Sequence, residues 1–365
     1  MVKNKKLIVF MPSIEDGGVE KNLFLILNYL SKKLDTIYLI TFNKKHNNKF
    51  NSNIKILTPF FNPEIIKGRY LKYFFCLLVL LQKTIFNKDH LVLSFQANIF
   101  VIIFCKIFGL KVLSRSNSSS QGWSKNKFKK FIFKLFFKKA DKIIVNSYEF
   151  KKEMDKRYGI KSKCILNPFD FRKIKSLSKK KIKNSHNKKK IRLITIGRLT
   201  DQKDIITIFK AINELLDINL ELIVIGKGET ENELKKYIYS NFLEKKIKLI
   251  GYRKNPYPYL RNAQIFILSS KFEGSPNVLV EALFFRKYVI STNCPTGPKE
   301  ILANGKYGDL VKIGDYKKIA QLIKAYTKKK SRKINSMNIA HLNKFNYKSN
   351  CKEYLNLISN FLLDK

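Results

Sequence analysis

The segment FEGSPNVLVEAL, residues 272–283, places two acidic side chains around a predicted helix start in a strongly basic chain. Glu273 and Glu281 stand on either side of a Gly-Ser-Pro sequence and a short apolar run. Ser275 is suited to the N-cap position. Pro276 is suited to the first helical position, because the N–H that proline lacks would have no partner there. The sequence therefore predicts a helix that begins at Pro276.

The backbone amides at this helix start indicate what the segment could bind. We expect the N–H groups of Asn277 and Val278 to point out of the helix end, where the helix dipole is positive. Such an end suits an anionic or oxygen-rich ligand. Glu281 follows these residues by four and three positions and so shares their helical face, and Glu273 lies just outside the cap. Two carboxylates beside amide donors predict a pocket for a polyol with a phosphate nearby.

Short apolar runs typical of buried strands alternate with longer helical patterns in both halves of the chain, which predicts parallel α/β sheets. The runs in the first half are residues 7–11, 36–42, 91–95, 110–116 and 142–147. The runs in the second half are residues 191–197, residues 220–226, IKLIGY, AQIFILSS and YVIST. Open parallel sheets bind ligands at the carboxyl ends of their strands, so we expect the loops after these runs to carry the site.

A chain of 365 residues exceeds what one core usually organises, so two domains are expected. We assign residues 1–171 to an N-terminal Rossmann-like domain and residues 191–345 to a C-terminal one, with a ligand cleft between them. Residues 172–190 are basic with almost no apolar content and are interpreted as a linker. Residues 346–365 are interpreted as a C-terminal helix that packs back on the first domain.

The net charge of +46 indicates an anionic partner, such as nucleic acid, an acidic membrane leaflet or a phosphorylated ligand. The charge is mostly lysine and is spread over the whole chain, whereas a nucleic-acid reader is expected to concentrate arginine on one element. The five cysteines form no C-x-x-C pair and are interpreted as buried thiols of a reducing compartment. Neither a metal site nor a disulfide scaffold is expected.

No targeting segment or membrane span is expected. The apolar run after the basic start is too short for a signal-peptide core. The two most apolar stretches are residues 73–81 and the run from Ile99, which Lys106 interrupts. Both are too short or too broken to cross a bilayer and are interpreted as buried helices. A cytoplasmic protein is predicted.

Over most of its length the sequence resembles a GT-B glycosyltransferase of the large retaining family 4, the glycosyl transferases group 1. The similarity is strongest in residues 269–302, which hold the family's pair of glutamates separated by seven residues. The resemblance implies that Glu273 faces the hydroxyls of the donor sugar and that Glu281 accepts from the nucleotide ribose. It also implies that the residues between them contact the donor: Ser275, Pro276, Asn277, Val278 and Leu279.

Two further loops match the family. Gly197, Arg198 and Lys203 in GRLTDQKD correspond to the segment whose arginine and lysine hold the donor diphosphate. Fixed cations there would stabilise the charge of the departing nucleotide diphosphate. Gly17 and Gly18 in EDGGVEKN follow the first predicted strand, where glycine lets the backbone approach a phosphate. The resemblance implies neither a metal ion nor another cofactor, because the arginine and lysine serve in place of the metal.

The loop SRSNSSS, residues 114–120, follows a predicted strand of the first domain. Many family members carry a polar residue there, often histidine, that meets the sugar. This chain has Arg115 and Asn117 instead, and we predict both on the acceptor side. For Arg115, contact with an acceptor phosphate and a structural ion pair are equally compatible with the sequence.

Residues 123–142, WSKNKFKKFIFKLFFKKADK, predict an amphipathic helix with an aromatic face and lysines around it. This composition is typical of a helix on the surface of an anionic bilayer, and a core helix with a solvated lysine face is the alternative. Membrane contacts are predicted for Phe128, Lys129, Phe133 and Phe137. A lipid-linked acceptor would follow from such contacts.

Together these observations predict a retaining glycosyltransferase that moves a sugar from a UDP-sugar to a glycan acceptor, with Arg198, Lys203 and Glu273 as its catalytic residues. The preferred sugar is an N-acetylhexosamine and the preferred acceptor a polyprenyl-diphosphate-linked glycan, as in the assembly of capsule or lipopolysaccharide. We expect a peripheral protein on the inner face of the cytoplasmic membrane. The alternatives are a GT-B phosphorylase, a sugar-nucleotide epimerase and a basic nucleic-acid-binding protein.

Overall fold

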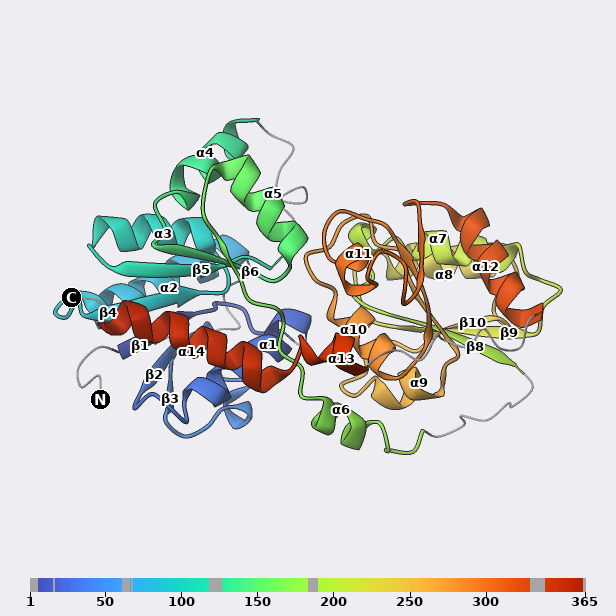
Figure 1. The fold of residues 1–365 in the computed structure, drawn as a ribbon, viewed down its shortest axis with the longest axis horizontal. Coiled ribbons are helices and arrows are strands. Elements are labelled where there is room, and N and C mark those ends of the chain that lie inside the picture. Colours follow the sequence, from blue (N-terminus) through green and yellow to red (C-terminus); the bar gives the residue numbers. More distant parts are fainter. Residues whose placement is uncertain are drawn as a thin grey trace. The chain divides into compact units, whose positions relative to one another are not determined.

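The computed structural model describes residues 6–15, 17–60, 66, 68–117, 127–182, 190–328 and 339–363. The chain divides into two compact units. Unit 1 comprises residues 1–169 together with residues 344–365, and unit 2 comprises residues 170–343. Each unit contains one parallel sheet with helices between its strands (Figure 1). The predicted fold class, two Rossmann-like α/β domains with parallel sheets, is confirmed.

The sheet of unit 1 has the strand order β3-β2-β1-β4-β5-β6-β7, and all its neighbours are parallel. Its central strands are short runs of leucine, isoleucine and valine buried on both faces, as a sheet covered by helices on each side requires. The strands are β1 (Lys6–Phe10), β2 (Ile37–Ile40), β3 (Ile54–Leu57), β4 (His90–Ser94), β5 (Lys111–Arg115), β6 (Lys142–Val145) and β7 (Lys163–Cys164).

The helices of unit 1 come from both ends of the chain. They are α1 (Gly18–Leu30), the 3-10 helix η1 (Asn47–Lys49), α2 (Arg69–Thr84), α3 (Asn98–Ile107), α4 (Lys127–Phe137), α5 (Tyr148–Tyr158) and α14 (Tyr347–Leu363). The C-terminal helix α14 lies beside α1 and also contacts β4 (Figure 1). Its apolar side chains join the core of unit 1 through Tyr354, Ile358 and Leu362. The chain therefore returns to its first unit at the end.

The sheet of unit 2 has the strand order β10-β9-β8-β11-β12-β13 and is also parallel. Its strands are β8 (Ile191–Ile196), β9 (Leu220–Ile225), β10 (Ile247–Leu249), β11 (Ile265–Leu268), β12 (Tyr288–Thr292) and β13 (Asp309–Val311). Its helices are α6 (Phe171–Leu177), the 3-10 helix η3 (Asp201–Lys203), α7 (Ile205–Asn213), α8 (Glu231–Ser240), α9 (Tyr257–Asn262), α10 (Asn277–Phe284), α11 (Pro298–Ile301), α12 (Tyr316–Lys328) and α13 (Ile339–Asn343).

Part of the predicted linker, residues 172–190, is a helix of unit 2. Helix α6 is packed against the rest of unit 2, because Phe171 stacks on Phe284 with ring centroids 4.9 Å apart and Ile174 is buried. The Asn255 side chain also donates to the Leu177 carbonyl at 2.9 Å. Two apolar residues one turn apart were enough to anchor a short helix in an otherwise basic segment.

Within the described part of the chain, no helix has both the length and the apolar character needed to cross a bilayer.

Candidate functional site

The strand order of unit 2 reverses between β8 and β11. The chain leaves β8 toward β9 on one side of the sheet, and β11 pairs with β8 on the other side. Loops diverge at such a switch point, so a crevice for ligands forms at the carboxyl ends of the two strands. Gly197, Arg198 and Lys203 follow β8, and Glu273 follows β11. The fold thus brings the loops of two distant motifs, which carry the predicted catalytic residues, to the same edge of the sheet.

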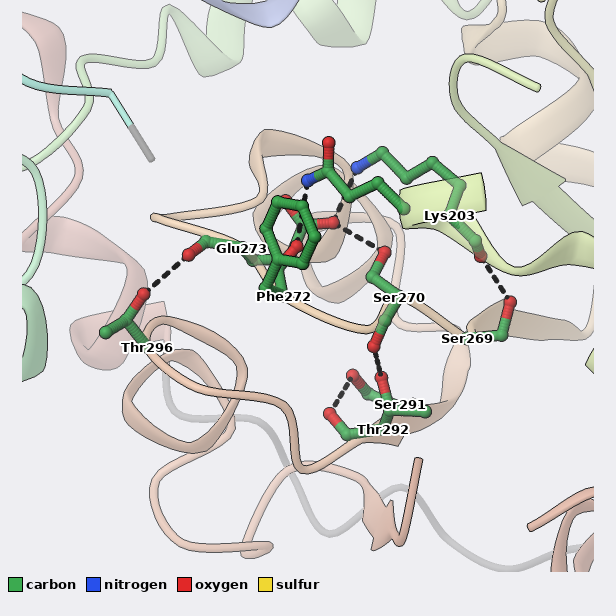
Figure 2. Close-up of polar contacts among 9 residues, drawn as sticks. Lys203, Ser269, Ser270, Phe272, Glu273, Ser291, Thr292 and Thr296 are labelled. Atoms are coloured by element: carbon green, nitrogen blue, oxygen red, sulfur yellow. Dashed lines mark hydrogen bonds and ion pairs between the residues drawn. The ribbon is translucent and has the colours of Figure 1, made fainter. Parts of the chain in front are cut away.

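Lys203 and Glu273 are paired directly at this point. The distance from Lys203 Nζ to Glu273 Oε1 is 2.5 Å, and both side chains are largely buried (Figure 2). Low solvent exposure strengthens the attraction between opposite charges relative to a surface ion pair. Arg198, in contrast, is exposed immediately after β8. One cation is therefore held against the carboxylate, and the second is accessible to an anionic ligand.

Two neighbouring serines form hydrogen bonds with the Glu273 carboxylate and with the backbone of Lys203. The Ser270 hydroxyl donates to Glu273 Oε1 at 2.6 Å, and the Ser269 hydroxyl donates to the carbonyl of Lys203 at 2.8 Å (Figure 2). Within the described chain, both hydrogen bonds to the Glu273 side chain end on Oε1. Oε2 is therefore the atom of this carboxylate that can accept from a ligand. The sequence analysis missed both serines, since no spacing rule identifies their partners.

The loop after β12 supports the loop that carries Glu273. Thr296 donates its hydroxyl to the Glu273 carbonyl at 2.6 Å and has a φ of 59°, which is rare for a β-branched residue (Figure 2). Gly297 has a φ of 89°, and a Cβ atom there would lie 2.7 Å from the carbonyl oxygen of Gly274. The hydrogen bond of Thr296 and the tight approach of Gly297 hold the two loops together, and strained conformations such as that of Thr296 are concentrated at functional sites.

The helix between the two glutamates begins one residue later than predicted. Helix α10 starts at Asn277, and Pro276 takes the N-cap position with an extended ψ of 108°. The prediction of Ser275 as a side-chain N-cap is therefore wrong: the proline, whose φ is fixed, already occupies the turn. Leu279 donates its amide to the Pro276 carbonyl at 3.1 Å and is buried, and its contact with a donor stays a prediction. Asn277 and Val278 are partly exposed.

Glu281 lies inside unit 2, only 1% exposed, on the same helix. Its Oε1 accepts a hydrogen bond from the hydroxyl of Tyr257 at 3.0 Å, and Tyr257 is itself buried. Tyr257 begins α9, in a segment that the sequence analysis did not connect with the site. Its contact fixes the orientation of the predicted ribose-binding carboxylate.

The loops after β8 and β9 approach each other closely. A Cβ atom on Gly226 would lie 1.8 Å from the carbonyl oxygen of Gly197, and one on Gly228 would lie 2.0 Å from that of Leu199. Only glycine fits at such distances. A Cβ on Gly197 would instead make ordinary contact with the Lys203 side chain at 3.5 Å. Gly226 and Gly228 therefore allow the loop after β9 to pack closely against the loop that carries Arg198 and Lys203.

Gly17 and Gly18 stand where α1 begins, after β1 of unit 1. Gly17 is the N-cap of α1, and a Cβ there would lie 2.6 Å from the Glu20 carboxylate. Glu20 is the third residue of the helix and is buried, which is the position of a carboxylate that caps the helix start. The approach of a donor phosphate to Gly17 and Gly18 stays a prediction.

Arg115 is the last residue of β5, and Asn117 follows the strand at the carboxyl edge of the first sheet. Arg115 is 1% exposed, and it donates to the Tyr354 hydroxyl at 2.8 Å and to Asn167 Oδ1 at 2.7 Å. These neutral partners come from α14 and from the loop after β7, so Arg115 fastens the C-terminal helix to unit 1. Arg115 forms no ion pair with an acidic side chain among the described residues, and its contact with an acceptor phosphate stays a prediction. Asn117 donates to the Phe95 carbonyl at 2.9 Å, and its contact with an acceptor stays a prediction.

Helix α4 only partly matches the predicted membrane contacts. Phe137 is 3% exposed, with its ring centroid 5.7 Å from that of Tyr158 in α5, so its predicted contact with lipid is wrong. Its position on α4 turns it toward α5 and into the core. Phe133 is partly exposed, whereas Phe131 and Leu135 are exposed. The side chains of Phe128 and Lys129 lie outside the described residues.

The five cysteines are free and buried, as predicted. Burial raises the pKa of the Cys294 thiol to about 12, and the nearby Glu273 carboxylate acts in the same direction. Cys294 therefore stays protonated beside the ion pair. The described residues contain no cluster of three or more His, Cys, Asp or Glu side chains that could hold a metal ion.

The sequence profile of the family described as glycosyl transferases group 1 matches residues 178–340. An uncharacterized glycosyltransferase of Methanocaldococcus jannaschii is 31% identical over 318 residues, which cover 78% of this chain and 74% of the relative. The chain belongs to the glycosyl transferases group 1. This membership favours a transferase over the phosphorylase, epimerase and nucleic-acid-binding alternatives. The protein is a glycosyltransferase, and such enzymes act on nucleotide sugars.

Two further similarities extend over nearly the whole glycosyltransferase. A Campylobacter jejuni protein is 27% identical over 334 residues, 88% of this chain and 89% of the relative. Its name is N-acetylgalactosamine-N,N'-diacetylbacillosaminyl-diphospho-undecaprenol 4-alpha-N-acetylgalactosaminyltransferase. The crystal structure of HepE from Anabaena in complex with UDP superposes with a TM-score of 0.78 at 16% identity, covering 98% of this chain and 100% of that one. The second similarity shows that the fold is that of a GT-B enzyme.

Proposed function

We propose that this glycosyltransferase retains the anomeric configuration, as family 4 enzymes do, and moves an N-acetylhexosamine from a UDP-sugar to a polyprenyl-diphosphate-linked glycan. The product would enter a cell-surface polysaccharide such as capsule or lipopolysaccharide, assembled at the inner face of the cytoplasmic membrane. The Campylobacter relative supports this proposal, because its name describes an N-acetylgalactosamine transferred to an undecaprenyl-diphosphate-linked acceptor and its length is matched almost completely.

The pairing of Lys203 with Glu273 at the switch point of unit 2, beside the exposed Arg198, is the observation that carries the proposal. Glycosyl transfer from a UDP-sugar breaks the bond between the anomeric carbon and the β-phosphate oxygen. Negative charge then develops on the departing diphosphate. Preorganised cations aimed at that charge lower the barrier, and removal of one such group typically costs about 100-fold or more in rate. Arg198 and Lys203 supply these cations without a metal ion.

The two glutamates would bind the donor on either side of the diphosphate. Glu273 Oε2 would accept from a hydroxyl of the donor sugar, while Lys203 and Ser270 hold Oε1. Glu281 would accept from the ribose, held in place by Tyr257. The acceptor hydroxyl then attacks the anomeric carbon from the face that the diphosphate leaves, and its proton passes to the departing phosphate oxygen. The new glycosidic bond therefore has the configuration of the donor.

A donor panel tests the proposal. Purified enzyme is incubated with UDP-GalNAc, UDP-GlcNAc, UDP-glucose and GDP-mannose, with and without EDTA. Its melting temperature and its transfer to a polyprenyl-diphosphate-linked disaccharide are then measured. We expect a UDP-N-acetylhexosamine to raise the melting temperature by mass action and to give an α-linked product from the α-configured donor, with EDTA having no effect.

Transfer only from a GDP-sugar would overturn the assignment of the donor. An inverted linkage would overturn the retaining mechanism, and loss of transfer in EDTA would overturn the metal-free role of Arg198 and Lys203.

A further inference from the structure

Helix α2 has two apolar faces, and only one of them is buried. The buried face consists of Cys76, Val79 and Leu80, which contact the core of unit 1. The opposite face is exposed, with Leu71 at 51% and Phe74 at 54%, and it continues through Leu78 and Ile85. Positions three, four or seven apart lie on one side of a helix, so these side chains form one stripe. The expectation of a buried helix in this stretch holds for one side of α2 only, and the other side is exposed.

Helix α3 extends the exposed stripe sideways. It contacts α2, and its Phe100 is 43% exposed (Figure 1). The Phe100 ring lies 6.1 Å from the Tyr70 ring and 5.9 Å from the Tyr73 ring, measured between centroids. These edge-on and tilted contacts join the two helices into one continuous apolar area. We call it the α2–α3 surface and define it by Tyr70, Leu71, Phe74, Leu78 and Phe100.

The charge around this surface is almost entirely positive. Residues 65–140 contain fifteen lysines and arginines but a single acidic residue, Asp89. The Arg69 guanidinium lies over the Tyr70 ring at 5.4 Å, at the margin of the α2–α3 surface. No acidic residue occurs in α2, α3 or α4. Lys106 of α3 pairs with Asp141 at 2.7 Å, but α2 carries Arg69, Lys72 and Lys83 and no acidic residue, so the positive charge of α2 is not balanced within the helix.

Exposed aromatic and aliphatic side chains on a helix that carries only positive charges match the headgroup boundary of an anionic bilayer. The rings would enter the boundary between headgroups and acyl chains, and the lysines would meet the lipid phosphates. A second copy of the chain fits less well, because it would present the same positive charge to the same surface.

We infer that the α2–α3 surface docks the enzyme on an anionic lipid bilayer. This inference deepens the proposed function, on which it rests for its purpose, since a polyprenyl-linked acceptor is held in the bilayer. It moves the main lipid contact from α4, where the sequence analysis placed it, to α2 and α3. The exposed Phe131 and Leu135 of α4 are then secondary contacts.

Vesicle binding tests the inference. The full chain is sedimented with vesicles of phosphatidylcholine alone or of phosphatidylcholine with phosphatidylglycerol. The test variant is L71Q/F74Q/L78Q, and the matched control L216Q/Y239Q/F242Q changes three exposed apolar side chains of unit 2. We expect the wild type to bind only the anionic vesicles and to dissociate in high salt. The test variant should bind at least about tenfold more weakly, and the control should bind like the wild type.

Equal binding of the test variant and the wild type would overturn the inference, as would binding to neutral vesicles with the same affinity. A concentration-dependent dimer that the test variant loses would assign the surface to a second copy instead. The melting shift with UDP-sugar is measured on the same proteins without vesicles, because the substituted side chains lie outside the donor site. Vesicle binding without a donor shift would refute the proposed function and leave the docking surface standing.

Discussion

At the scale of single residues, the ion pair of Lys203 and Glu273 joins two motifs that lie 70 positions apart in the chain. The carboxylate has a dual task in the proposed mechanism: it orients the lysine and accepts from the donor sugar. A glutamine at position 273 keeps the shape of the side chain and removes its negative charge, so the contribution of the charge can be measured separately.

We predict that Glu273→Gln lowers kcat for sugar transfer by about 100-fold, because Lys203 loses its charged partner and the sugar loses a strong acceptor. The melting temperature should change by only a few degrees, since the partner groups remain hydrogen bonded. Initial rates at saturating donor measure the effect. The exposed Glu244 provides the control variant Glu244→Gln, which should be fully active. A Glu273→Gln enzyme with wild-type kcat would show that this carboxylate does not take part.

Tyr257 offers a second test at this scale. Tyr257→Phe removes the hydrogen bond to Glu281, whose carboxylate is buried, and a bond to a charged group typically contributes about 1.5–3 kcal/mol. We expect a lower free energy of unfolding in urea and a weaker affinity for UDP. Tyr239→Phe, at an exposed position, should change neither. Unchanged UDP affinity in Tyr257→Phe would separate Glu281 from the nucleotide.

The site residues that could be predicted from the sequence are those that belong to short motifs with a characteristic spacing. Glu273 and Glu281 flank a turn and a helix, and Arg198 and Lys203 follow a strand. Ser270, Tyr257 and Thr296 could not be predicted, because their partners depend on how loops from β11, β12 and α9 meet. The partner of Arg115 could not be predicted for the same reason, since Tyr354 lies 239 positions away.

At the scale of elements, the close approach of the loops after β8 and β9 determines where Arg198 and Lys203 stand. Gly226→Ala would place a methyl group 1.8 Å from the Gly197 carbonyl oxygen, so one of the two loops must move. We predict a loss of stability of about 3 kcal/mol or more and a matching loss of donor affinity, as for other overpacked or strained sites.

Gly314→Ala is the matched control for that variant. Gly314 has a φ of 77° and open space around it, so alanine there costs only the left-handed strain, about 1–2 kcal/mol. Urea unfolding of both variants measures the difference. Equal losses of stability would contradict the view that the close approach of Gly226 to the Gly197 carbonyl oxygen makes the alanine variant more costly.

The strands were easier to predict than the helix faces. Runs such as residues 7–11 and 191–197 are apolar on both sides and could only be central strands of a parallel sheet. The short strands β3, β7 and β13 were missed, since few residues carry their pattern. For α2, composition indicated burial, yet only the sheet beneath it decides which side is covered and which is exposed.

At the scale of the whole molecule, both sheets reverse their strand order beside their first strand, between β1 and β4 in unit 1 and between β8 and β11 in unit 2. Each unit therefore presents a set of loops at the carboxyl ends of its strands, the usual place for ligands in such sheets. The loops after β1 and β4 are joined by Ser13, whose amide donates to Gln96 Oε1 at 3.0 Å. Most of the predicted donor-binding residues lie in unit 2, and Gly17 and Gly18 lie in unit 1.

The burial of the cysteines predicts that their thiols are unreactive in the native protein. Burial raises the pKa of Cys76, Cys105, Cys294 and Cys351 to about 12, well above the usual value for a thiol. A thiol of raised pKa carries little thiolate at pH 8, and only the thiolate reacts. We expect a thiol reagent to modify none of the five cysteines at pH 8 in the native protein and all five in guanidinium chloride. Rapid native modification would contradict the described packing.

The central claim, that Lys203 binds the donor diphosphate at the switch point of unit 2, is tested most directly by calorimetric titration of UDP into two lysine variants. We predict that Lys203→Met weakens the affinity for UDP by at least about tenfold relative to the wild type, since a charge-assisted hydrogen bond is lost. Lys236→Met, at an exposed position on α8, should bind UDP like the wild type. Equal affinity of the Lys203→Met variant and the wild type would contradict the account.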